Sequence, residues 1–103
     1  SQAKTAGYSK DKWNDVLGGL NGVFTEFAAC KKYGDSSDSE TAQSLVKKLQ
    51  EYITASFYHC TDDILAGLGQ MYVCDERFKN NIDSHGEGTA EFVAKAIKIY
   101  CKK

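Results

Sequence analysis

Neither sign of charge predominates in this 103-residue sequence, in which 13 lysine and arginine residues stand against 14 aspartate and glutamate residues. Nucleic-acid-binding domains usually present a net basic face, so this balance argues against binding of nucleic acid by this domain. It also argues against a polybasic contact with a membrane. No apolar run approaches the roughly 20 residues that a membrane-spanning helix needs, and no segment has the apolar core of a signal peptide.

Cysteine patterns typical of metal sites are missing as well. The four cysteines, Cys30, Cys60, Cys74 and Cys101, are widely spaced, and no two of them form a C-x-x-C pair. We expect four free thiols in a cytoplasmic protein, because an isolated cysteine in a helical pattern behaves as a small core hydrophobe. His59 lies beside Cys60, but a zinc site needs three or four ligands at characteristic spacing. We therefore expect no metal and no cofactor.

Paired carboxylates occur at Asp62-Asp63 and at Asp75-Glu76. Both pairs fall at predicted helix N-termini, where the helix dipole favours negative charge. No nucleophile and base accompany them, so the sequence predicts a protein that is not an enzyme. For Arg77 and Asp83 we expect salt-bridge or capping roles, since a ligand-anchoring role for Arg77 would need a cleft beside it.

Apolar residues recur at helical spacing along the whole chain and predict an all-α domain of five helices, with no strand. A chain of this size buries one modest core, so any pocket should be a cleft between helices. The first helix is expected between the N-cap Ser9 and the stop at Gly34. Each of its three glycines costs about 1 kcal/mol relative to alanine. We therefore expect a break or a mobile segment near Gly18-Gly19.

Local capping signals predict where the other helices begin. Ser37 with Glu40 forms a capping box for a second helix that ends near Tyr58. The later helices are expected to begin at Thr61, Asp75 and about Thr89. Their predicted inward-facing residues include Ile64, Leu65, Leu68, Met71 and Tyr72, then Phe78 and Ile82. Aromatic residues make up 12% of the chain, and several of them near Met71 would suit an adaptable apolar cleft.

The most specific motif is LGQMYVCDERF at residues 68–78, followed by Asn81-Ile82-Asp83 and preceded by Tyr58-x-Cys60. This block resembles the TipAS antibiotic-recognition domain, the C-terminal effector domain of TipA-like regulators in the MerR family. The pattern Tyr8-Ser9-Lys10-x-x-Trp13 resembles the start of the same domain. The resemblance therefore covers nearly the whole chain.

The resemblance implies a compact globin-like array of about five helices, with a ligand cleft and an N-terminal helix that is mobile without ligand. It implies that residues 1–103 form a single effector-binding domain, a fragment of a homodimeric regulator. An N-terminal winged-helix domain that binds DNA and a dimerising coiled coil would lie outside it. The implied ligands are bulky hydrophobic antibiotics, with peptide antibiotics of the thiopeptide class the best known.

One difference from the family bears on chemistry. The family cysteine that captures dehydroamino-acid ligands covalently would align at Gly67, so we expect non-covalent binding here. Ligand contacts are expected from Trp13, Phe57, Tyr58, Cys60, Leu68, Met71, Tyr72 and Phe78.

The sequence is consistent with three functions. The first is the drug-sensing domain of a multidrug-responsive transcriptional activator. The alternative is a stand-alone protein that confers resistance by sequestering the antibiotic. A haem protein is a third hypothesis, for which only His59 and His85 could bind iron.

Overall fold

The computed structural model describes residues 4–102, and within them it contains one short 3-10 helix and five α-helices. Their bounds are η1 (Lys4–Gly7), α1 (Lys10–Tyr33), α2 (Glu40–Ser56), α3 (Asp62–Cys74), α4 (Glu76–Asp83) and α5 (Thr89–Cys101). None of the helices in this part of the chain combines the length and apolar character needed to cross a bilayer.

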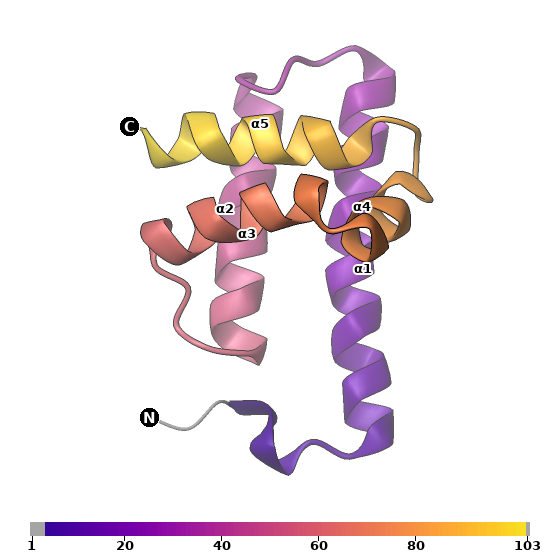
Figure 1. Ribbon diagram of the computed structural model, residues 1–103, viewed down its shortest axis with the longest axis vertical. Helices are drawn as coiled ribbons and strands as arrows, with labels where there is room; N and C mark the ends of the chain where they lie inside the picture. The colour runs from indigo at the N-terminus through magenta and orange to yellow at the C-terminus, as the bar shows by residue number, and fades with distance from the viewer. Residues whose placement is uncertain (1–3, 103) are drawn as a thin grey trace.

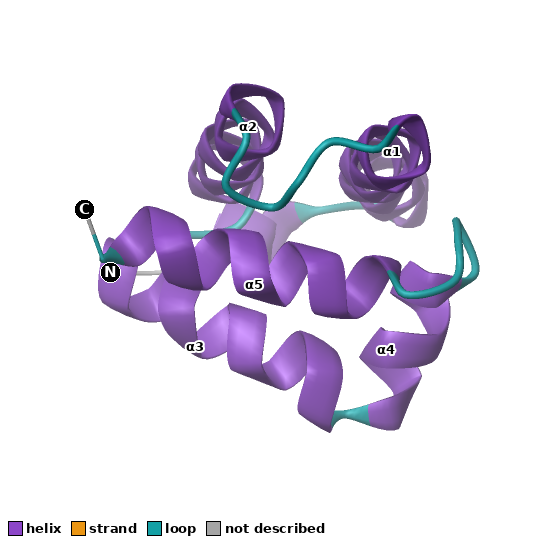
Figure 2. Ribbon diagram, turned by 90° about the horizontal axis from the view of Figure 1, so that it is seen from above, coloured by secondary structure: helices purple, strands orange, loops and turns teal. Residues whose placement is uncertain are grey.

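The helices form two layers (Figures 1 and 2). In Figure 1, α1 rises from the N-terminal end and α2 returns antiparallel beside it. The antiparallel pair α3 and α5 crosses them in front, and α4 closes the side of this layer next to α1. Figure 2 shows α1 and α2 almost end on, above the layer of α3, α4 and α5. The core lies between the two layers.

The predicted caps are present at four helix ends. The Ser9 hydroxyl accepts a hydrogen bond from the Lys12 N–H at 3.1 Å, and the Thr61 hydroxyl accepts one from Ile64 N–H at 3.2 Å. The Asp75 carboxylate accepts one from the Arg77 N–H at 2.9 Å. Gly34 ends α1 with a φ of 103°, a left-handed conformation that favours glycine. These predictions are confirmed because capping depends on residues close in sequence.

Two predictions for α2 are wrong. The N-cap is Ser39, whose hydroxyl accepts from Ala42 N–H at 3.1 Å, whereas Ser37 is buried and its carbonyl accepts from the Gln43 amide at 2.9 Å. The helix also ends at Ser56 rather than near Tyr58. Phe57 already leaves helical geometry with a φ of −120°, because the chain turns there toward α3.

The break expected in α1 is absent: the helix is continuous from Lys10 to Tyr33. Gly19 has a packing role, since a Cβ atom at this position would overlap the Tyr52 hydroxyl. That hydroxyl donates a hydrogen bond to the Val16 carbonyl at 2.7 Å. Gly18 and Gly22 have no neighbouring atom within 4 Å of such a Cβ. Close approach of α2 explains one of the three glycines.

The core is built from the apolar stripes of α1, α2, α3, α4 and α5 together. Its largest fully buried apolar side chains are Phe24, Phe27, Leu49, Leu65, Ile82 and Ile97. Two predicted inward-facing residues, Ile64 and Phe78, are exposed instead. Ile64 lies in the first turn of α3. Phe78 lies at the edge of a cleft.

Candidate functional site: an apolar cleft between α1, α2, α3 and α4

Apolar side chains from both layers converge on a cleft of about 260 Å³. The cleft lies between the middle of α1, the end of α2, the second half of α3 and the start of α4. The residues that line it are Leu17, Leu20, Ile53, Phe57, Tyr58, Leu68, Met71, Tyr72 and Phe78. An apolar cavity with few polar groups is the usual form of a site for a small organic ligand.

The structure brings six of the eight predicted site residues together on this cleft: Phe57, Tyr58, Leu68, Met71, Tyr72 and Phe78. Leu68, Met71 and Tyr72 share one face of α3 because they are three and four residues apart. Phe78 reaches the cleft from α4 and is 38% exposed. Its ring lies 6.1 Å from that of Tyr72, centroid to centroid. The contacts of these residues with a ligand stay a prediction.

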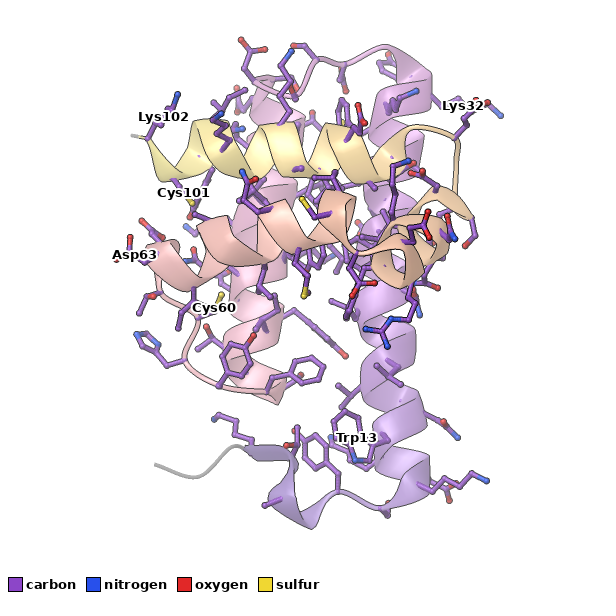
Figure 3. All side chains as sticks on the ribbon, viewed as in Figure 1. Trp13, Lys32, Cys60, Asp63, Cys101 and Lys102 are labelled. Atoms are coloured by element: carbon purple, nitrogen blue, oxygen red, sulfur yellow. The ribbon has the colours of Figure 1, made fainter. Side chains whose placement is uncertain are left out.

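Trp13 stands beside the cleft rather than in its lining. Its ring centroid lies 6.1 Å from that of Phe57 and 5.6 Å from that of Tyr8. Figure 3 places Trp13 on the lower half of α1, and 36% of its surface is exposed. It therefore covers the outer side of the cleft wall that Phe57 forms.

Cys60 lies outside the cleft lining and belongs to the buried core. Burial raises the pKa of its thiol, and the neighbouring Cys101 and Asp62 raise this pKa further. The thiol is therefore protonated at neutral pH and is a poor nucleophile. All four cysteines are free thiols.

Three cleft residues were not among the predicted site residues: Leu17, Leu20 and Ile53. In the sequence they continue the apolar stripes of their helices and are indistinguishable from core positions. In the structure Leu17 is 43% exposed, because the layer of α3 and α5 does not extend over it. Only the packing of the layers identifies them as cleft residues.

The polar residues of α4 have the structural roles that the sequence predicted. Arg77 pairs with Asp75 at 3.0 Å, and hydrogen bonds from Arg77 lower the pKa of this carboxyl. Asp83 pairs with Lys79 at 3.0 Å and accepts the Ala90 N–H at 2.8 Å. A hollow of about 300 Å³ does lie beside Arg77, lined also by Phe78 and Asn81.

The two histidines occupy different parts of the molecule. His85 lies against α1, where its ring nitrogens are 3.1 Å from the Thr25 hydroxyl and 3.2 Å from Asn21 Oδ1. His59 lies in the α2–α3 connection beside Cys60. Within residues 4–102 no group of three or more His, Cys, Asp or Glu side chains is placed to hold a metal ion.

The fold and the cleft together define an all-α domain that can hold an apolar small molecule between its helices. The chain belongs to the TipAS antibiotic-recognition domain family, which it matches over residues 1–100. This is a family of binding domains and not of enzymes.

Two transcription factors with a similar segment are the HTH-type transcriptional activators mta of Bacillus subtilis and TipA of Streptomyces coelicolor. The chain is 37% identical to mta over 101 residues, which are 98% of this chain. It is 34% identical to TipA over 97 residues, which are 94% of this chain. In both cases the match with this chain covers only 38% of the length of the relative.

Two solved structures share the fold. TipAS from Streptomyces lividans in complex with nosiheptide, part of a thiopeptide antibiotic multidrug resistance system, superposes with a TM-score of 0.87 at 32% identity. The match covers 96% of this chain and 69% of that one. The antibiotic-binding domain of a TipA-class multidrug resistance transcriptional regulator gives a TM-score of 0.77 at 30% identity, over 84% of this chain and 93% of that one. The predicted TipAS-like fold is confirmed.

Proposed function

We propose that this chain is the drug-sensing domain of a multidrug-responsive transcriptional activator and that it binds bulky hydrophobic antibiotics non-covalently. The observation that carries the proposal is the convergence of nine apolar and aromatic side chains on one cleft. The nosiheptide complex of TipAS, which has the same fold, supports a thiopeptide-like peptide antibiotic as the ligand class.

A bulky ligand requires the cleft to widen. Sites for drug-sized ligands usually enclose about 300–1,000 Å³, and this cleft encloses about 260 Å³. The N-terminal half of α1 is the element that can move, because Val16 is the one buried residue between Lys10 and Gly22. Binding would then favour an open arrangement of α1 by differential affinity for the two states.

Regulation would follow from this rearrangement. We propose that the full protein is a cytoplasmic homodimer in which an N-terminal winged-helix domain and a coiled coil precede this domain. A shift of α1 would then change the position of the DNA-binding part through the coiled coil. DNA would be contacted by that part and not by residues 1–103.

Non-covalent binding is supported by the residues near the cleft. Gly67 offers no side chain, and Cys60 is buried with a raised thiol pKa. A ligand that carries a dehydroamino acid therefore meets no reactive thiol at either position.

Binding can be tested by titrating the domain with nosiheptide and a panel of hydrophobic antibiotics. We expect a saturable change in Trp13 fluorescence and shifts of amide resonances in α1, α3 and α4, with no mass adduct on the protein. A panel that produces no change would overturn the proposal. A reporter gene driven by the full-length protein separates sensing from sequestration: induction supports the sensor, and binding without induction supports the sequestering protein.

A further inference from the structure

The hydroxyl of Tyr72 differs from the other inward-pointing tyrosine hydroxyls. Tyr8 donates to the Ser56 carbonyl at 2.5 Å, Tyr52 donates to the Val16 carbonyl at 2.7 Å, and Tyr100 donates to Gln50 Oε1 at 3.2 Å. Tyr72 is only 3% exposed, yet its hydroxyl makes no hydrogen bond with any residue of the described chain. A buried tyrosine hydroxyl normally has a partner.

The Tyr72 hydroxyl opens into the cleft. The side chain is part of the cleft lining, and its ring is held edge-on by Phe24 at 5.4 Å and flanked by Phe78 at 6.1 Å. Within residues 4–102, Gln43 Oε1 is the one side-chain polar atom that is both sealed from solvent and without a hydrogen-bond partner. The Tyr72 oxygen is therefore not sealed from solvent, and the cleft is the opening that the Tyr72 side chain lines.

The hydroxyl is a donor in this environment. Burial raises the pKa of the Tyr72 phenol, and the neighbouring Tyr58 and Cys60 raise it further. The phenol is thus neutral across the physiological range. Apart from the half-exposed Tyr58, the other side chains of the lining are those of leucine, isoleucine, phenylalanine and methionine. Tyr72 is the polar group deep in an otherwise apolar site.

We propose that the Tyr72 hydroxyl selects ligands that place a hydrogen-bond acceptor, an amide carbonyl oxygen or an aromatic ring nitrogen, deep in the cleft. This inference rests on the proposed function and specifies its ligand class. A hydrocarbon ligand would strip water from the hydroxyl without replacing the bond. A site with a buried donor discriminates strongly against ligands that lack its partner.

The test compares Tyr72→Phe with the wild-type domain, using two probes. Nosiheptide is a peptide antibiotic with many carbonyl acceptors, and N-phenyl-1-naphthylamine is an apolar fluorescent probe with no carbonyl or ring nitrogen. Loss of the hydroxyl should weaken nosiheptide binding about threefold to tenfold, the effect of one hydrogen bond. The affinity for N-phenyl-1-naphthylamine should be unchanged or higher. The melting temperature of the free variant should not fall, because the hydroxyl has no hydrogen-bond partner among residues 4–102 to lose.

Tyr100→Phe is the matched control, because it removes a tyrosine hydroxyl that is bonded to Gln50 and does not belong to the cleft lining. It should leave both affinities unchanged. Equal nosiheptide affinity of Tyr72→Phe and wild type would overturn the inference, as would an equal loss for both probes, which would indicate ring packing. If the wild-type domain binds N-phenyl-1-naphthylamine but not nosiheptide, acceptor selection is also wrong. If it binds neither probe nor any antibiotic of the panel, the proposed function itself fails.

Discussion

The two halves of α1 belong to the same helix but are held in different ways. In the C-terminal half, Val23, Phe24 and Phe27 are buried between the layers. In the N-terminal half Trp13 and Leu17 are exposed, and η1 contributes no buried residue. Figure 1 shows this half of α1 extending below α3 and α5.

Specific polar contacts hold the N-terminal half in place of burial. The Lys4 N–H donates to the Phe57 carbonyl at 3.1 Å, and the Tyr8 and Tyr52 hydroxyls bond to backbone carbonyls across the same junction. Each such bond contributes a net of about 1 kcal/mol, whereas a buried phenylalanine contributes several times more. The cleft lies at the boundary between the two halves of α1, so we expect it to open by movement of the N-terminal half.

The strongest test of this comparison is a pair of truncations in α1. Phe27→Ala should lower the free energy of unfolding by about 3–5 kcal/mol, because it leaves a cavity in a fully packed core. Leu17→Ala should cost less, about 1 kcal/mol, since Leu17 is 43% exposed. Urea denaturation followed by circular dichroism measures both. Equal losses would show that the two halves are held alike.

A second test uses the three glycines of α1. Gly18→Ala and Gly22→Ala should stabilise the protein by up to about 1 kcal/mol, because alanine favours the helix and meets no neighbour. Gly19→Ala should instead destabilise it by about 1–2 kcal/mol, since the new methyl group displaces the Tyr52 hydroxyl. Thermal unfolding gives the stabilities.

Hydrogen exchange then localises the effect of the Gly19 substitution. Amides of residues 10–22 should exchange faster in Gly19→Ala, while those of the C-terminal half of α1 keep the protection that their burial gives. A stabilised Gly19→Ala variant would show that the contact between Tyr52 and α1 does not hold this half.

The smallest expected effect concerns a polar contact inside the well-packed region. Burial opposes ionisation of Asp83, but the Ala90 N–H and the Lys79 ammonium outweigh it and lower the pKa of the carboxyl. A lowered native pKa contributes stability that is present above the unfolded pKa of about 3.9 and is lost as the pH falls through the native pKa.

Asp83→Asn should therefore cost roughly 0.5–1 kcal/mol at pH 7. The difference from wild type should disappear as the pH falls below about 4 and Asp83 itself becomes protonated. Lys79→Ala keeps the bond from the Ala90 N–H and should show a smaller loss. Urea titrations at several pH values check this, and a difference that persists in acid would contradict it.

Much of the fold is predictable from short stretches of sequence. Ser9, Thr61, Asp75 and Gly34 mark helix ends correctly because a cap acts within three or four residues. The prediction fails at Ser37, where the choice between two nearby serines depends on Gln43 and on α5. The break expected near Gly18-Gly19 is also absent, and at Gly19 the packing of Tyr52 accounts for the glycine.

The sequence by itself determined the number of α-helices, the family, and six residues of the cleft, because helical periodicity and the motif at residues 68–78 are local properties. The tertiary structure decided that Leu17, Leu20 and Ile53 complete the cleft and that Cys60 belongs to the core. It also decided that the hydroxyl of Tyr72 has no hydrogen-bond partner within the part of the chain that the structure describes. These properties depend on how the two layers meet, since exposure and hydrogen bonding are set by residues far apart in the chain.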